Sequence, residues 1–146
     1  MITICNMTAQ HVAQVAELEK LCFADPWSEK SIASELEHDY ALWLVAVEEE
    51  TVIGYVGAQI SFEEADVMNV AVHPNHRRQR IAEKLMDALI AQLQTRQCIG
   101  LTLEVRDSNQ PAIALYEKLG FVQVGLRKNY YYNPKEDARI LRKDII

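Results

Sequence analysis

The sequence predicts an α+β domain in which single helices interrupt runs of strands. Three observations lead to this prediction. An apolar run of strand type, Met68 to Val72, is followed at once by a turn and an amphipathic helix. Three strand-like segments, of which this run is the last, are joined by short acidic turns, and a later strand and helix lead to further strands. The 146 residues, 49% hydrophobic and 25% charged, fit one globular domain over residues 1–146.

The N-terminal part predicts one strand and two helices. Ile2 to Cys5 has a strand pattern, and Thr8 and Ser28 are suited to cap the two helices. The inner face of the first helix is expected to carry Val12, Val15, Leu18, Leu21 and Cys22, and that of the second Ile32, Ala33 and Leu36. Phe23 and Trp27 flank the break between the helices. Such aromatics either bind a ligand or close the edge of the core, and both interpretations stay open.

Three consecutive strands are expected next, at residues 41–48, 52–62 and 66–72. Their connections are too short for a crossover, so the strands are expected to form an antiparallel meander. Gly54 and Gly57 interrupt the second strand, which predicts a bulge or a close approach of backbone.

The turn after this meander is a candidate anion site. Its helix is expected to begin near Arg78, with an apolar stripe of Ile81, Ala82, Leu85, Met86, Leu89, Ile90 and Leu93. A helix start has unpaired N–H groups and partial positive charge, and Arg77, Arg78 and Arg80 add charge there in a chain of net charge −6. This pattern predicts a phosphate site; the alternative is a solvated basic turn.

A carboxylate is expected on the strand that Gly100 opens. Along residues 101–106, apolar and polar side chains alternate, so Glu104 lies mid-strand on the polar face, close to the strand at 66–72. A rigid carboxylate that is partly shielded from water is a candidate general base. The alternative is an ion pair with Arg106 or with another cation across the sheet.

A second helix follows this strand. Residues 107–109 are suited to cap it and Gly120 to end it, with Ala112, Ile113, Leu115, Tyr116 and Leu119 along its length. Strands are expected at residues 121–126 and 139–145, reached through a connection at 128–134 that contains Tyr130 and Tyr131. Tyr116 is either a structural aromatic or a functional group.

Composition excludes several classes of protein. No run approaches the roughly 18 apolar residues of a membrane span, and the N-terminus lacks a signal-peptide pattern, so we expect a cytoplasmic protein without a membrane partner. Cys5, Cys22 and Cys98 are odd in number and lack metal-ligand spacing; we expect buried free thiols and no metal site. The acidic balance argues against nucleic acid and leaves room for a cationic or amine substrate.

Residues 77–82, Arg-Arg-Gln-Arg-Ile-Ala, resemble the pyrophosphate loop of the GCN5-related N-acetyltransferases (GNAT family), Gln/Arg-x-x-Gly-x-Gly/Ala. Arg77 and Ala82 match the end positions, whereas Arg80 stands where the family has glycine. Residues 104–121 also resemble the second half of the domain of that family. The resemblance covers nearly the whole chain and implies the GNAT fold, a mixed and mostly antiparallel sheet flanked by helices.

The resemblance also implies residue roles, with acetyl-CoA as co-substrate. Glu104 corresponds to the proton acceptor and Tyr116 to the proton donor. The implied cofactor-binding residues are Val70, Ala71, Val72, Arg77, Arg78, Gln79, Arg80, Ile81, Ala82, Glu83 and Asn109. Segments 23–30 and 127–131 are similar to the substrate-side segments of bacterial ribosomal-protein-alanine N-acetyltransferases, which implies that Trp27, Tyr130 and Tyr131 bind the substrate. The acceptor is then the N-terminal α-amine of a ribosomal protein.

Two alternatives stay open. An acetyltransferase for a small amine or an internal lysine needs Glu104, Tyr116 and the phosphate loop, but not the aromatic segments. A module that binds acyl-CoA or a partner without catalysis is favoured by Arg80 and opposed by the presence of both Glu104 and Tyr116. The sequence does not predict an oligomeric state.

Overall fold

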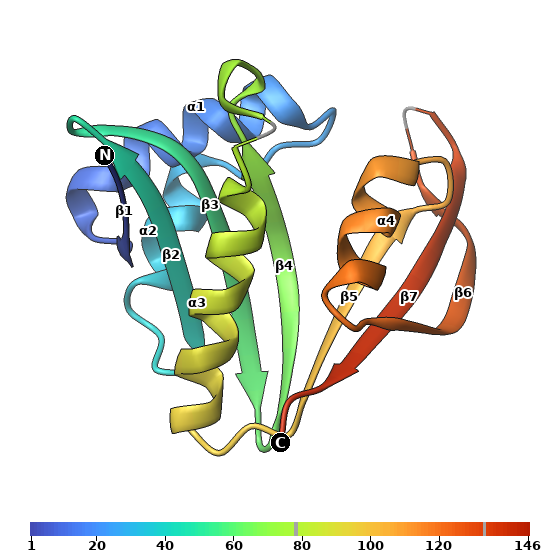
Figure 1. Ribbon diagram of the computed structural model, residues 1–146. Coiled ribbons are helices and arrows are strands. Elements are labelled where there is room, and N and C mark those ends of the chain that lie inside the picture. Colours follow the sequence, from blue (N-terminus) through green and yellow to red (C-terminus); the bar gives the residue numbers. More distant parts are fainter. Residues whose placement is uncertain (78, 133) are drawn as a thin grey trace.

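The computed structural model describes residues 1–77, 79–132 and 134–146. They contain a seven-stranded sheet in the order β1-β2-β3-β4-β5-β7-β6, with helices on both faces (Figure 1). The strands are β1 (Ile2–Asn6), β2 (Ala41–Glu48), β3 (Thr51–Ser61), β4 (Glu64–Val72), β5 (Gly100–Arg106), β6 (Val122–Tyr131) and β7 (Glu136–Asp144). The helices are α1 (Val12–Cys22), α2 (Glu29–Glu35), α3 (Ile81–Thr95) and α4 (Gln110–Lys118), with short 3-10 turns at Ala9–His11 and Pro74–His76.

Two apolar cores lie on opposite faces of the sheet. The residues of α3 and α4 that face inward, among them Leu85, Leu89 and Ile113, pack on one face. Val15 of α1 and Ile32 of α2 pack on the other. β1 to β4 pair antiparallel in sequence order, which confirms the predicted meander.

The predicted irregularity of β3 lies at Gly57. The register of β3 with β4 shifts after Gly57, so that Met68 of β4 has no opposing residue and forms a bulge. A Cβ on Gly57 would lie 2.4 Å from the Trp43 ring, which explains the absence of a side chain there. A bulge bends and twists its strand. β4 and β5 diverge towards the C-terminal end of β4 (Figure 1).

β4 and β5 are parallel neighbours over only three residue pairs, from Glu64 with Gly100 to Asp66 with Thr102. Arg142 of β7 crosses this short junction and forms an ion pair with the Glu64 carboxylate. Gly100 leaves the space for it, because a Cβ there would lie 2.1 Å from the Arg142 guanidinium. The sheet is therefore closed at one end and splits towards the other.

The C-terminal hairpin is longer than predicted. β6 continues to Tyr131, five residues past the expected end, and β7 begins at Glu136. Tyr130 and Tyr131 thus lie on a strand and not on the predicted connection. The polar and aromatic run at 127–132 resembles a loop because β6 is an edge strand with most side chains exposed.

Two helix faces also differ from the prediction. Leu21 of α1 is exposed, as are Ala33 and Leu36 at α2. Their places inside are taken by two carboxylates, Glu19 and Glu35, which are buried because they accept hydrogen bonds from donors in the sheet.

The predicted start of α3 near Arg78 was three residues early. The helix begins at Ile81, and its N-cap Arg80 is left-handed, with φ 59° and ψ 27°. A left-handed residue cannot belong to a right-handed helix, so the chain turns at Arg80 before the helix starts. Within the described ranges, the helices are too short or too polar to cross a lipid bilayer, and no group of side chains is arranged to hold a metal ion.

Candidate active site

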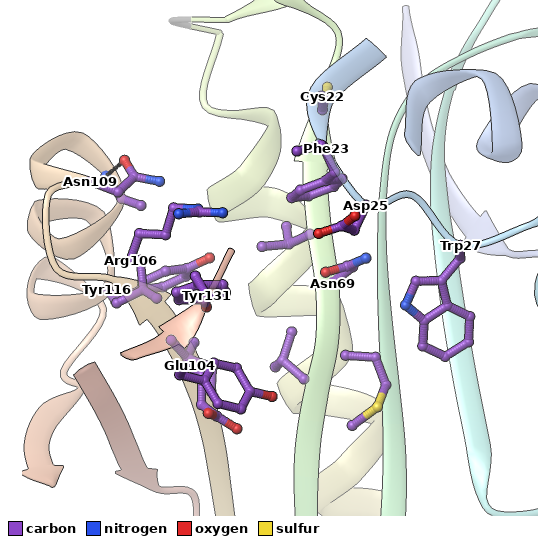
Figure 2. Close-up of a pocket in the computed structure, with 18 residues that line it drawn as sticks. Cys22, Phe23, Asp25, Trp27, Asn69, Glu104, Arg106, Asn109, Tyr116 and Tyr131 are labelled. Atoms are coloured by element: carbon purple, nitrogen blue, oxygen red, sulfur yellow. Dashed lines mark hydrogen bonds between the residues drawn. The ribbon is translucent and has the colours of Figure 1, made fainter. Parts of the chain in front are cut away.

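A pocket of about 670 Å³ opens where β4 and β5 diverge (Figure 2). One wall comes from the α1–α2 connection and β4, the other from β5, α4 and the end of β6. The lining residues are Cys22, Phe23, Ala24, Asp25, Trp27, Val67, Met68, Asn69, Val70, Leu103, Glu104, Val105, Arg106, Asn109, Ala112, Tyr116, Tyr130 and Tyr131. Both predicted catalytic residues and all three predicted substrate residues are among them.

Glu104 lies on β5 with its carboxylate towards the pocket (Figure 2). The side chain is 28% exposed. Arg127 Nε is 3.2 Å from Glu104 Oε2. Glu104 therefore does form an ion pair with a cation across the sheet, which was the alternative to a role as general base. Among the described residues, however, no donor makes a hydrogen bond to this buried oxygen. Glu104 is therefore balanced by charge and still has a free acceptor.

Arg106 is not the partner of Glu104. Its guanidinium bonds to Glu136 Oε1 at 3.0 Å and to the carbonyl oxygens of Tyr132 and Pro134, both at 2.8 Å. It also lies over the Tyr131 ring, 4.4 Å from the centroid. Arg106 thus ties the β6–β7 turn to the end of β5.

Tyr116 projects from α4 into the pocket wall and is 5% exposed. Its ring packs edge-on against Phe121, with centroids 5.6 Å apart. Burial raises the pKa of Tyr116, and the nearby Tyr131 raises it further. Burial likewise raises the pKa of Tyr131, to about 12, with Glu104 as the next cause. Both phenols are therefore protonated at neutral pH.

The part of β4 that carries the expected cofactor-binding residues Val70, Ala71 and Val72 lies at the same opening. Within the described chain, β4 has no paired strand on the β5 side beyond Asp66. Val70 lines the pocket, whereas the side chain of Ala71 is buried in the core and Val72 ends the strand. A backbone edge without a strand partner fits an extended ligand with amide groups.

The predicted phosphate loop leads from β4 to α3. Arg77, Gln79 and Arg80 are exposed, and Arg78 lies outside the described residues. Ile81, Ala82 and Glu83 form the first turn of α3, with Ile81 buried and Glu83 paired with Lys118 of α4 at 3.2 Å. The first N–H groups of this turn have no partners within the helix.

Arg80 keeps the conformation that glycine would adopt most readily. Its left-handed backbone costs about 1 kcal/mol for a residue with a Cβ. The side chain is exposed, so the departure from the family motif does not fill the loop. The residues present therefore fit a pyrophosphate at the start of α3.

Asn109 is the N-cap of α4, and its side chain accepts a hydrogen bond from Ala112 N at 3.3 Å. It lines the pocket, and its predicted contact with the cofactor stays a prediction. Its capping bond is a structural role of its own.

Sequence reasoning missed three polar groups on or below the pocket wall. Asn69 and Asp25 line it, and Glu19 is buried behind it. A polar residue within the apolar run of β4 was a signal for Asn69. The prediction of three buried thiols is correct only for Cys98; Cys5 and Cys22 are half-buried, and Cys22 lines the pocket.

Comparisons with known proteins agree with this geometry. The chain is 36% identical over 147 residues to the ribosomal protein bS18-alanine N-acetyltransferase of Escherichia coli (strain K12), covering 99% of each chain. It is 38% identical over 139 residues to the protein of that name from Haemophilus ducreyi, covering 93% of this chain and 95% of that one. The crystal structure of the ribosomal-protein-S18-alanine N-acetyltransferase from Escherichia coli matches with a TM-score of 0.91 at 35% identity, over 99% of this chain and 94% of that one.

The family match covers most of the chain. The Acetyltransferase (GNAT) family matches residues 12–121. The predicted fold, a mixed sheet flanked by helices, is confirmed, as is the predicted co-substrate. The chain belongs to the Acetyltransferase (GNAT) family, whose acetyl donor is acetyl-CoA.

Proposed function

We propose that this enzyme acetylates the N-terminal α-amine of a protein, with Glu104 as general base and Tyr116 as general acid. The observation that carries the proposal is that these two side chains, from β5 and α4, line one pocket with three aromatic side chains of its walls. The expected acceptor is the N-terminal alanine of a ribosomal protein, the substrate that the names of the relatives state for those proteins.

Acetyl-CoA supplies the activated acetyl group. An α-ammonium of pKa about 8 must lose a proton before its nitrogen can attack the thioester carbon. The free acceptor capacity of Glu104 suits it to take this proton, and the ion pair with Arg127 holds the carboxylate in place.

When the carbon–sulfur bond breaks, the leaving thiolate needs a proton. Because burial raises the pKa of Tyr116, its hydroxyl is still protonated at neutral pH and can donate to the sulfur. Direct transfer needs no covalent enzyme intermediate, so the proposal assigns no role to the half-buried Cys22.

The walls favour a peptide acceptor over a free small amine. Trp27, Tyr130 and Tyr131 provide rigid contact area at low entropic cost. Asp25 adds a carboxylate to the wall, whereas the charge of Arg106 is paired with Glu136. We therefore expect a preference for peptides with basic residues after the first.

The test is acetylation of a panel of peptides and small amines, with the modified atom located by mass spectrometry. We expect the α-amine of an Ala-initiated basic peptide to be acetylated and internal lysines to be spared. Modification of lysine side chains or of a small amine alone would overturn the acceptor assignment and leave the acetyltransferase intact.

Tyr116→Phe tests the proposed acid separately. No hydrogen bond of the Tyr116 hydroxyl occurs among the described residues, so the variant should fold with unchanged stability. We expect kcat to fall by on the order of 10²-fold while acetyl-CoA affinity is retained. An unchanged kcat would return Tyr116 to a structural role.

A further inference from the structure

A buried carboxylate that the proposed reaction does not use lies directly behind the pocket. Glu19 of α1 has no exposed surface. No lysine, arginine or histidine of the described residues lies within ion-pair distance of it. Burying a carboxylate without a cation is unfavourable unless its oxygens are hydrogen-bonded.

Neutral donors from three other segments supply these bonds. The backbone N–H of Trp27 donates to Oε1 at 2.8 Å. The amide Nδ2 of Asn69 lies 3.0 Å from Oε1 and 2.9 Å from Oε2. The Tyr55 hydroxyl donates to Oε2 in a short hydrogen bond. One carboxylate therefore joins α1, the α1–α2 connection, β3 and β4.

Two of these partners belong to the pocket wall. Trp27 and Asn69 line the pocket (Figure 2), and Asn69 follows directly after the Met68 bulge. Glu19 and Tyr55 are fully buried and do not line the pocket. The Trp27 ring also packs edge-on against Trp43, which stacks on Tyr55. The backbone bond to Glu19 fixes where Trp27 enters this stack.

We propose that Glu19 is a positioning residue that holds the Trp27 segment against β4 and so shapes the acceptor side of the pocket. This inference rests on the proposed peptide acceptor. The carboxylate is suited to the task because it accepts from all three donors at once. An amide at the same position has one accepting oxygen, so its NH₂ group would face the NH₂ of Asn69, and Tyr55 would have to turn from donor to acceptor.

Burial raises the pKa of Glu19, while its bonds from Trp27 and Asn69 lower it. At neutral pH the charged form is therefore less favourable for folding than the protonated form would be. A carboxylate that is kept buried against this cost and bonds to two pocket residues is more simply explained by positioning than by stability alone.

The test compares Glu19→Gln with Glu35→Gln. Glu35 is a second buried carboxylate, 6% exposed, which accepts from Trp43 Nε1 at 3.1 Å and Gln59 Nε2 at 2.8 Å; neither it nor its two donors line the pocket. We expect Glu19→Gln to raise the KM of an Ala-initiated peptide about tenfold, with acetyl-CoA Kd unchanged. Glu35→Gln should leave both constants unchanged.

Iodide quenching of tryptophan fluorescence provides a readout without substrate. Trp43 is buried, so the quenchable emission belongs to the half-buried Trp27, which Trp27→Phe verifies. Glu19→Gln should raise the quenching constant roughly twofold, and Glu35→Gln should not. If the wild type acetylates no α-amine, the proposed function fails, while the quenching result still decides the position of Trp27.

Unchanged peptide KM and unchanged quenching in Glu19→Gln would overturn the proposal, even if the variant unfolds at a lower temperature. Should Glu19→Gln not fold, Tyr55→Phe replaces it, because it removes one donor to Glu19 and keeps the ring on Trp43. A smaller rise in KM with raised quenching supports the positioning role; no change in either measurement contradicts it.

Discussion

The two walls of the pocket are fixed by opposite kinds of interaction. On the N-terminal side, Trp27 is tied to a fully buried carboxylate whose donors, among residues 1–77, 79–132 and 134–146, are all neutral. On the C-terminal side, Tyr131 lies under the Arg106 guanidinium, which is partly exposed and paired with Glu136. One wall is therefore held by a dry hydrogen-bond network and the other by an ion-pair network open to water.

This difference predicts different behaviour in solution. Exposed charges are screened by salt, whereas buried hydrogen bonds are not. β6 also has an exposed edge and few buried side chains. The wall formed by Tyr130 and Tyr131 therefore depends on the ion pair of Arg106, whereas the wall formed by Trp27 depends on buried hydrogen bonds. The position of the C-terminal wall should therefore change with salt concentration more than that of the N-terminal wall.

The largest effect is expected between the walls, at Glu104. Glu104→Gln should lower kcat by on the order of 10²- to 10⁴-fold and leave acetyl-CoA affinity unchanged, because a proton acceptor is lost while the contacts that hold Trp27 and Tyr131 are retained. Since free amine becomes abundant at high pH, the loss should shrink as pH rises from 7 to 9. The measurement is steady-state kinetics across that range. If kcat does not fall, or if its loss is the same at every pH, Glu104 is a structural partner of Arg127 and not the general base.

Arg106→Gln tests whether the C-terminal wall depends on an ion pair. Loss of its bonds to the β6–β7 turn should raise peptide KM about tenfold at low salt. Salt screens the Arg106–Glu136 pair, so the difference in peptide KM between Arg106→Gln and wild type should be smaller in 1 M salt. The difference in peptide KM between Glu19→Gln and wild type should not depend on salt.

The control for this prediction is Arg139→Gln. Arg139 pairs with Asp107 at 2.6 Å on the same sheet but does not line the pocket, so its loss should leave peptide KM unchanged. Equal salt dependence for the Arg106 and Glu19 variants would contradict the distinction between the walls.

Acid should affect the stabilities of the two walls with opposite sign. Hydrogen bonds from Arg106 and Ser108 lower the pKa of Glu136, so its stabilising contribution is present above the unfolded-state pKa and is lost as pH falls through the folded value. Burial raises the pKa of Glu19, so its unfavourable contribution grows as pH rises from the unfolded value through the folded one.

The measurement is urea unfolding of wild type, Glu136→Gln and Glu19→Gln between pH 4 and pH 7. On acidification, the stability of wild type relative to Glu136→Gln should decrease, and relative to Glu19→Gln it should increase. Slopes of the same sign would rule out this assignment of the two carboxylates.

The smallest effect is expected away from both walls, at Arg80. Arg80→Gly removes the strain of a left-handed residue with a Cβ, so unfolding free energy should rise by at most about 1 kcal/mol. Acetyl-CoA affinity should stay the same, because the contact is expected from N–H groups at the start of α3. Isothermal titration checks this; a wild type that binds no acetyl-CoA, with binding restored in the variant, would contradict the enzyme assignment.

Most of the fold could be predicted because local signals agreed with it. Short acidic turns indicated the meander, and Gly57 indicated the irregularity of β3. The end of β6 could not be predicted, since an edge strand exposes polar residues such as Lys128 and resembles a loop. The start of α3 was missed because the left-handed turn lies at an arginine and not at a glycine.

The site could be predicted only in part, because several of its residues interact with segments that are distant in sequence. Alternation on β5 was enough to place Glu104 on the polar face of its strand. Helical spacing places Glu19 on the same face as Val12 and Val15, but its donors could not be predicted because they come from other segments of the chain. The Arg106–Glu136 pair likewise required the hairpin to fold back on β5.

The most direct test of this account is a crystal structure with an acceptor analogue, in which CoA is joined through an acetyl bridge to the α-nitrogen of an Ala-initiated peptide. We expect the α-nitrogen within hydrogen-bond reach of Glu104, directly or through one water, with the sulfur beside Tyr116 and the peptide between Trp27 and Tyr131. A peptide that leaves the pocket without contact to either wall, or a sulfur remote from Tyr116, would contradict it.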